Sequence, residues 1–502
     1  MSRTPPLRGS RSAMRQSRKI DCIASLAMTA LLASCSLVPA FKPPAVMPPA
    51  SYKEQPAGAE VVAMRGRWQA VHSLEKENRG QWWKIFDDPQ LNDLEQQAEK
   101  ANPSLQASAA RVAESRDIAR ANVPSLLPDI GIGGNAVRAQ PAAAGLAAFG
   151  QPGKNLHPYT LYAAQGEADY EADLFGQVRA NYKAFLHDAD AMAAAYRSAL
   201  LALQADVAQD YFGLRTLDAE RQTLRDAVAV RKEAARIMQA RFNQGDAGKP
   251  DMAGAESALA SAQAGLLALD RGRAAMEHAL AVLLGKLPST FMLAENPLAG
   301  NPPQIPPGLP SQLLARRPDV AEALSSMAAA NARVGAARAA FFPSLMLTAT
   351  GGYESTGLSD LLRWSNRTWA LGQLSGLALS MPIFDNGRNQ AQLAAAHAAY
   401  DEAVANYHSQ VLIAFRDVED NLAAQRLLAG QAERTDEAAA SAEQVTGLTR
   451  KRYDAGDADY SEVVTAEQQS LTDERAAAEM RGARFSAAVS LIRALGGGWS
   501  EP

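Results

Sequence analysis

QVRANYKAFL…RIMQARFNQ (residues 177–244) is a long stretch that contains no proline and is rich in alanine. RNQAQLAAAH…LTRKRYDA (residues 388–455) has the same character and the same place in a second copy of one sequence unit. At about 1.5 Å per residue, each stretch predicts a helix about 100 Å long, far beyond the ordinary length in globular proteins. Helices of this length span something, so these two stretches decide the fold.

The duplication is visible as a constant offset between equivalent residues. An offset of 211 relates five clear pairs, which are Gly176/Gly387, Asp206/Asp417, Arg241/Arg452, Gly245/Gly456 and Gly285/Gly496. Upstream, an offset of 215 relates Pro103 to Pro318 and Pro128 to Pro343. The change of four residues falls where the first copy carries a longer segment of Ala, Gly and Pro. An insertion of this kind marks a loop.

Strand patterns lie between the helices. From Thr368 to Met381, large apolar residues alternate with small or polar ones, apart from an interruption at 373–375. This period of two predicts a strand with one bulky apolar face, as in a strand between lipid and a lumen. The predicted partner strand is 344–353, within a hairpin over 344–383, and the first copy has a matching hairpin over 129–175 from strands 129–138 and 159–175. A soluble hairpin packed on helices is the alternative.

Each copy therefore reads as a helix, a hairpin, a very long helix, a sharp turn and a returning helix. Gly245 and Gly456 supply the left-handed conformation that ends a helix. The remaining helices are predicted at 89–123, 251–284, 318–342 and 462–495. The fold class is thus mixed α and β, built from a duplicated helix, hairpin and long-helix unit.

Four strands cannot close a membrane barrel, because about eight are the minimum and an open edge in lipid leaves unsatisfied backbone groups. An oligomer that pools strands into one barrel and helices into one tube removes the problem. A solid coiled-coil rod is the alternative reading of the alanine-rich helices. The predicted segments of the chain are a signal peptide (1–34), an acylated N-terminus and extended tether (35–80), a first repeat (81–288), a Pro-rich linker (289–317) and a second repeat (318–498).

The N-terminus carries an export pattern. Six basic residues precede a short apolar run at 23–33, which has the length of a signal-peptide core and is too short to cross a bilayer. The long basic region leaves Met14 as an alternative start. The run ends in LASC, which resembles a bacterial lipobox, so Cys35 is the expected site of acylation by fatty acids such as palmitate. A plain secretory signal is the alternative, and the other cysteine, Cys22, would be removed with it.

Composition predicts a folded chain: 47% of its 502 residues are hydrophobic, 21% are charged, and the mean hydropathy is −0.20. No run of about 18 apolar residues is present to form a transmembrane helix. Removal of residues 1–34 takes away six basic residues and one acidic residue, which leaves 44 basic and 53 acidic residues and a net charge of −9. A chain this acidic is not expected to bind nucleic acid.

Enzymatic motifs are not found in the sequence. There is no HExxH pattern, and neither GIGGN (131–135) nor GQPGKN (150–155) has the spacing of a nucleotide-binding loop. We therefore expect no catalytic residues, no metal site and no cofactor other than a covalent lipid on Cys35. Energy for any transport must come from a partner.

Several long blocks resemble the outer-membrane factor family, the TolC/OprM-like channels, and among them the NodT-like efflux lipoproteins. The blocks are WWKIFDDPQLNDLEQQAEKANPSLQASAARV (82–112), YEADLFGQVR (170–179), GLPSQLLARRPDVAEA (308–323), ARVGAARAAFFPSLMLTATGG (332–352) and RYDAGDADYSEVVTAEQ (452–468). The resemblance implies a homotrimer in the outer membrane of a Gram-negative bacterium. It implies a twelve-stranded β-barrel continuous with a periplasmic α-helical tunnel, and an equatorial region that includes the linker.

The same resemblance implies partners and a function. The channel would be a passive conduit for drugs and other small molecules, working with an inner-membrane pump of RND or similar type and a periplasmic adaptor, and so contributing to drug resistance. The lipobox and the YEADLFG block favour this reading. Two alternatives remain: the outer-membrane channel of an ABC-driven protein secretion system, and a lipoprotein scaffold that is not a channel.

The resemblance also assigns roles to the two helix turns. Both carry R-x-x-x-G, and in the family this element docks the adaptor's helical hairpin, so the expected docking residues are Arg241, Gly245, Arg452 and Gly456. The alternative for the arginines is a favourable interaction with a helix C-terminus. Carboxylates close the tunnel in the family, and the candidates here are Asp246, Asp251, Asp457, Asp459 and Glu462. Thr465 stands where a second acid is common, which puts a second ring in doubt.

Overall fold

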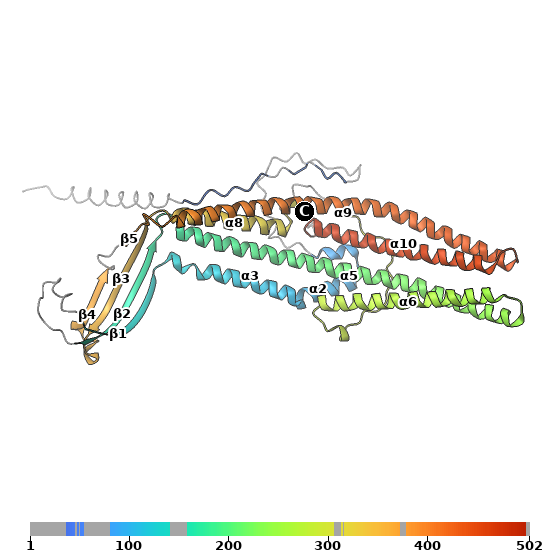
Figure 1. Cartoon of the computed structure of the whole chain (residues 1–502), viewed down its shortest axis with the longest axis horizontal. Helices are drawn as coiled ribbons and strands as arrows, with labels where there is room; N and C mark the ends of the chain where they lie inside the picture. Colours follow the sequence, from blue (N-terminus) through green and yellow to red (C-terminus); the bar gives the residue numbers. More distant parts are fainter. Residues whose placement is uncertain are drawn as a thin grey trace, which may run out of the picture. The chain divides into compact units, whose positions relative to one another are not determined.

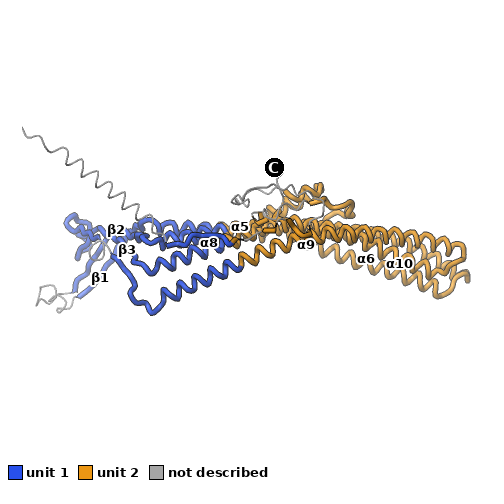
Figure 2. Tube along the Cα trace, turned by 90° about the horizontal axis from the view of Figure 1, so that it is seen from above, with its two compact units in different colours: residues 1–44, 114–190, 325–405 blue, residues 45–113, 191–324, 406–502 orange. Residues whose placement is uncertain are grey.

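The computed structural model describes residues 37–45, 48–49, 51–54, 81–140, 158–305, 313–314, 316–371 and 378–497. The predicted signal peptide, the lipidation site Cys35 and the hairpin loop at 141–157 lie outside these residues. The chain divides into two compact units, and each combines segments of both repeats (Figure 2). Unit 1 takes its described residues from 1–44, 114–190 and 325–405, and unit 2 from 45–113, 191–324 and 406–502. Division of the chain by repeat stays a prediction.

The two very long helices are confirmed nearly to the residue (Figure 1). They are α5 (Gln177–Gln244, 68 residues) and α9 (Arg388–Asp454, 67 residues). The returning helices are α6 (Lys249–Leu283) and α10 (Tyr460–Ala494), each of 35 residues and thus half as long, as predicted. Near the start of α5, the carboxylate of Asp173 accepts hydrogen bonds from the backbone N–H groups of residues 178 and 179. A side-chain acceptor of this kind satisfies donors that have no partner inside the helix.

The prediction of one helix over 89–123 is wrong. The chain forms α2 (Pro89–Ala101) and α3 (Pro103–Ala121), separated at Asn102. Proline disfavours the helical conformation of the residue before it, and Asn102 is extended (φ −65°, ψ 119°). Its side chain then caps α3 by accepting from the N–H of Leu105 at 2.9 Å, and it donates to the carbonyl of Leu283 at 2.9 Å. In the second repeat, α8 (Pro318–Ala339) ends three residues before the predicted position.

Unit 1 contains one antiparallel sheet in the order β1-β2-β3-β4, with β5 also paired to β3. The strands are β1 (Asp129–Ala139), β2 (Tyr159–Ala172), β3 (Ser344–Ser355), β4 (Arg367–Leu371) and β5 (Ala378–Ser380). The predicted strand at 368–381 is seen as β4 and β5, and residues 372–377 between them lie outside the described part. The two hairpins pair through β2 and β3, which leaves β1 at one edge and β4 with β5 at the other.

Large apolar side chains are exposed on the edge strands of this sheet. Ile132 on β1 is 94% exposed, Trp369 on β4 is 74% exposed and Leu379 on β5 is 66% exposed. The predicted apolar face of the second hairpin is therefore uncovered in a single chain. Among the described residues, no helix combines enough length and apolarity to cross a membrane.

The described parts of the N-terminal segment, which is predicted to be an extended tether, contact helices of the same chain. In unit 1, a Cβ placed on Gly335 would lie 2.7 Å from the side chain of Val38, so the segment lies directly on α8. In unit 2, Tyr52 is buried, and the carboxylate of Glu419 accepts from the backbone N–H groups of residues 53 and 54 at 2.9 and 3.0 Å. The described parts of this segment are thus fixed on helices of the same chain.

Two groups of side chains form much of the core of unit 2. An aromatic group joins the short helix at Trp82–Phe86 to α5 and α10, because Phe86, Phe212 and Phe485 have ring centroids 4.7–6.1 Å apart. Further along, Leu224 of α5 packs with residues of α6 and of α10 in a small buried cluster. These contacts hold the two helical hairpins of unit 2 together.

Candidate functional site

Both helix turns close with the same backbone hydrogen bonds. At the end of α5, the N–H of Gly245 donates to the carbonyl of Phe242 at 3.0 Å, and the N–H of Asp246 donates to that of Arg241 at 2.9 Å. At the end of α9, Gly456 and Asp457 repeat this pattern with distances of 3.0 and 2.9 Å. The glycines have φ of +84° and +82°, which a residue with a side chain rarely adopts. The glycine of R-x-x-x-G is therefore required by the turn itself.

Arg241 joins the two turns of one chain. Its Nη1 donates to the hydroxyl of Tyr453 at 2.7 Å, and its guanidinium lies 5.6 Å from the centroid of the same ring. The ring of Tyr453 in turn lies 5.5 Å from that of Tyr460, at the start of α10. The first turn is thus hydrogen-bonded to the second through Tyr453, which directly follows Arg452 in the sequence.

Arg452 has different partners from its counterpart. Its Nη1 lies 3.3 Å from Oε2 of Glu462, and its Nη2 donates to the carbonyl of Asp457 at 2.9 Å. The side chains of Arg452 and Glu462 are 56% and 48% exposed, so this ion pair contributes at most about 1 kcal/mol. The guanidinium ties down its own turn, and Glu462 keeps access to solvent.

The other candidate acids are divided between capping and open positions. Asp251 accepts from the backbone N–H of Gly248 at 3.2 Å and so caps the start of α6. Glu462 occupies the equivalent position at the start of α10, where its N–H donates to the carbonyl of Asp459 at 3.0 Å. The exposed acids are Asp246, Asp457, Asp459 and Glu462. The described residues contain no group of His, Cys, Asp and Glu that could hold a metal ion.

A buried arginine fixes the helices behind the turns. Arg231 of α5 is 4% exposed and donates to the carbonyl of Ala258 on α6 at 3.2 Å. It also donates to the side-chain oxygen of Gln468 on α10 at 3.1 Å. Burial lowers the pKa of Arg231 from its usual value. This residue links three helices of the two repeats, and its role was not predicted because it depends on helices distant in sequence.

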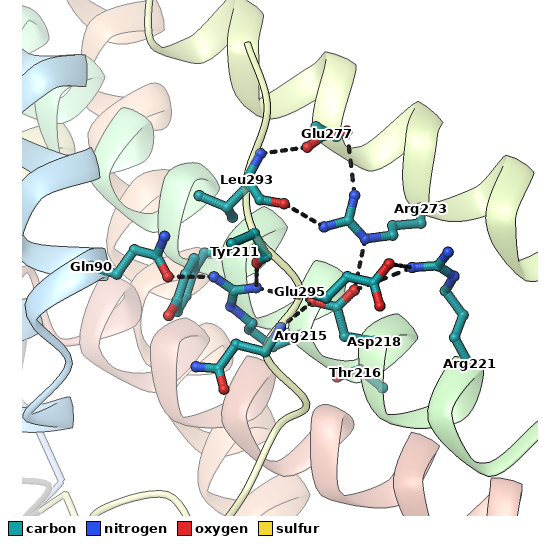
Figure 3. A network of polar contacts seen from close by, with 12 residues as sticks. Gln90, Tyr211, Arg215, Thr216, Asp218, Arg221, Arg273, Glu277, Leu293 and Glu295 are labelled. Atoms are coloured by element: carbon teal, nitrogen blue, oxygen red, sulfur yellow. Dashed lines mark hydrogen bonds and ion pairs between the residues drawn. The ribbon is translucent and has the colours of Figure 1, made fainter. Parts of the chain in front are cut away.

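A second unpredicted feature is a buried ionic cluster that holds the linker (Figure 3). Its centre is Asp218 of α5, whose side chain is fully buried and accepts from Arg215 at 2.9 Å and from Arg273 of α6 at 2.7 Å. Asp218 also accepts from the backbone N–H of Asn296 at 3.0 Å, and Arg273 donates to the carbonyl of Leu293 at 2.6 Å. The linker is therefore bound through its backbone. The signal for this cluster in the sequence was a series of charged residues at a spacing of three in an otherwise alanine-rich helix, namely Arg215, Asp218 and Arg221.

The outer part of the cluster is a pair of arginines around a linker carboxylate. Glu295 lies 2.5 Å from Arg225 and 2.8 Å from Arg221. Hydrogen bonds, first from Arg225 and then from Arg221, lower the pKa of Glu295 to about 2. Asp270 of α6 completes the arrangement through Arg221 at 2.5 Å. Each arginine here has a carboxylate partner.

Two helical hairpins related by duplication, with charged turns, together with an open sheet that exposes apolar side chains, define the class of membrane-associated channel proteins. Comparison with known proteins gives the family. The chain matches the family model described as outer membrane efflux protein over residues 94–286 and 309–497, and it belongs to this family. It is an outer-membrane efflux channel of a Gram-negative bacterium with a periplasmic tunnel.

Similar proteins agree with this assignment. The outer membrane protein OprJ of Pseudomonas aeruginosa is 32% identical over 497 residues, covering 95% of this chain and 96% of OprJ. The toluene efflux pump outer membrane protein TtgF of Pseudomonas putida is 31% identical over 482 residues, covering 95% and 97%. Among solved structures, the CmeC outer membrane channel of Campylobacter jejuni has a TM-score of 0.83 at 25% identity, covering 93% of this chain and 95% of that one.

Proposed function

We propose that this chain forms a homotrimer that serves as the outer-membrane conduit of a tripartite efflux pump. The main support for the trimer is the sheet of unit 1, which has two open edges. The sheet is four strands wide, because β4 and β5 both pair with β3 and share one strand position. Backbone groups on an open edge have no partner in lipid, so the sheet must close with other copies. Three copies supply twelve antiparallel strand positions, which is enough for a barrel. The exposed apolar side chains on β1, β4 and β5 suit the lipid-facing side.

The partners follow from the turns and from the family. A periplasmic adaptor docks at the turns through Arg241, Gly245, Arg452 and Gly456, and an inner-membrane pump of RND or similar type supplies the energy. The bond from Arg241 to Tyr453 supports a shared docking surface, because it places both turns of one chain side by side. The cargo is small molecules. Acylated Cys35 anchors the chain in outer-membrane lipid.

Glu462 is the acid that we assign to the periplasmic aperture. It is exposed, and among the described residues its side chain has only the weak ion pair with Arg452, whereas Asp251 is engaged in capping. Three copies around a symmetry axis would form a ring of negative charge that favours cations. Asp457 and Asp459, exposed on the same turn, add to this charge.

Planar-bilayer recordings of purified protein test the aperture. Glu462→Gln should reduce the preference for cations and change the single-channel conductance, because it removes one negative charge from each subunit. Glu479→Gln, at an exposed position on the same helix far from the turn, is the matched control and should leave both quantities unchanged. If the two variants are indistinguishable from the parent protein, Glu462 is not part of the aperture.

A further inference from the structure

A charged cavity lies in unit 2 between α9, α10 and the linker. Its volume is about 390 Å³, and its walls include Leu298 and Asn301 of the linker, Ala432 and Asp436 of α9, and Arg481 and Arg484 of α10. It is separate from the turns at the helix ends. None of its residues has a role in the conduit described above.

The internal duplication identifies the residues of the first repeat that correspond to the lining of the cavity. With the offset of 211, Arg481 and Arg484 correspond to Asp270 and Arg273, and Ala432 corresponds to Arg221. These counterparts are members of the ionic cluster around the linker (Figure 3). The cavity in the second repeat therefore corresponds in position to the ion-paired side chains of the first repeat.

The two places differ in charge balance. In the first repeat, four arginines face four carboxylates, and every arginine is paired; the set is Arg215, Arg221, Arg225 and Arg273 with Asp218, Asp270, Glu277 and Glu295. In the second repeat, Ala429 and Ala488 replace Asp218 and Glu277, and the counterpart of Arg215 is Arg426, which pairs with Glu54. Among the described residues that line the cavity, Asp436 is the single carboxylate beside Arg481 and Arg484. The cavity thus lacks one negative charge.

The two arginines also lack strong partners. Arg484 donates to Oδ1 of Asn301 at 2.7 Å, which is a neutral acceptor. Among the described residues, the side chain of Arg481 makes no hydrogen bond and no ion pair. Both side chains are partly buried, and a partly desolvated guanidinium without a carboxylate is unfavourable. In the first repeat, the counterpart of Arg484 is Arg273, which is paired with the carboxylate of Asp218 at 2.7 Å.

We propose that the cavity binds one carboxylate group, held by the guanidinium groups of Arg481 and Arg484. The group belongs either to a small free monocarboxylate or to an acidic side chain of a second copy of this chain. A single carboxylate restores the charge balance of the first repeat, and the volume admits one without movement of the helices. Guanidinium groups suit this ligand because they bind both carboxylate oxygens.

The test uses the purified full-length protein in detergent and ¹³C-labelled acetate as the probe. We compare Arg481→Gln with Arg271→Gln, an exposed arginine on α6. For a free carboxylate, NMR line broadening of acetate should saturate in the parent protein and in Arg271→Gln, and the saturable part should be lost in Arg481→Gln. Ala432→Glu, which supplies a carboxylate from within the cavity, should also abolish it.

If the carboxylate comes from a second copy, acetate should show no saturable broadening in the parent protein. Arg481→Gln should then dissociate into single subunits at a lower temperature or detergent concentration than Arg271→Gln. The proposal is overturned if acetate shows no saturable broadening and Arg481→Gln dissociates like the control.

Discussion

Asp218 is the single residue on which the binding of the linker depends most. Its carboxylate is fully buried and neutralises guanidinium groups that also hold linker carbonyls. Removal of one member of a buried ion pair leaves uncompensated charge, which is more costly than the loss of an exposed pair.

Asp218→Asn should therefore lower the free energy of unfolding by about 3–5 kcal/mol. Asp226→Asn, at an exposed position two turns further along α5, should change it by less than about 0.5 kcal/mol. Denaturant titration of both variants measures the difference. Equal stability of the two would show that the cluster does not hold the fold.

Asp210 gives the protein a defined response to pH. Burial, with a smaller contribution from the nearby charge of Asp206, raises the pKa of Asp210 from 3.8 to about 6. Between these values the folded chain keeps a proton on Asp210 that the unfolded chain loses, so the contribution of Asp210 to stability falls as pH rises from about 4 to about 6. Above about pH 6, Asp210 is ionised in the folded chain, and the free-energy cost of its buried charge is fully present.

Asp210→Asn removes this cost. The variant should be more stable than the parent protein at pH 8, and the gain should disappear as pH falls from 6 to 4. Thermal unfolding measured at several pH values checks this. A gain that is the same at pH 4 and pH 8 would exclude the titration of Asp210 as its cause.

Among the elements, α10 approaches α5 closely at one glycine. A Cβ on Gly482 would lie 2.2 Å from Oγ1 of Thr216, and Thr216 is itself buried and bonded to the carbonyl of Phe212. The side chain of Thr216 therefore has little room to move away from an added methyl group. By contrast, a Cβ on Gly272 of α6 would meet its nearest atom, in Leu217, at 3.9 Å.

The two substitutions Gly482→Ala and Gly272→Ala should act in opposite directions. Alanine favours a helix over glycine, so Gly272→Ala should stabilise the protein by about 0.5–1 kcal/mol. Gly482→Ala should destabilise it by about 1–3 kcal/mol, because the added methyl group overpacks the helix contact. Thermal unfolding of the pair is the measurement. Stabilisation by both would mean that the approach of α10 to α5 is not close.

Helices and turns were predictable where local chemistry decides them. Gly245 and Gly456 end the long helices because the closing turn needs a positive φ, and the residues around them show this in the sequence alone. The break at Asn102 was missed, although Pro103 signals it, because the polar side chain that stabilises the break binds a carbonyl far away in sequence.

Contacts between distant segments were not predictable in this way. Arg241 and Arg452 share a motif, yet one binds the opposite turn and the other its own, because Tyr453 has Phe242 as its counterpart in the first repeat. The buried cluster around Asp218 likewise depends on the path of the linker. Local patterns indicate elements, whereas such pairs depend on which elements become neighbours.

For the whole molecule, the account depends on closure of the sheet by other copies. Edge strands β1, β4 and β5 expose large apolar side chains, and the four strand positions of one chain cannot close in lipid. The measurement that tests this most directly is native mass spectrometry of protein extracted from outer membranes in detergent. We predict a complex of three chains, each carrying acyl mass on an N-terminal Cys35. A complex that contains only one chain would contradict the shared barrel.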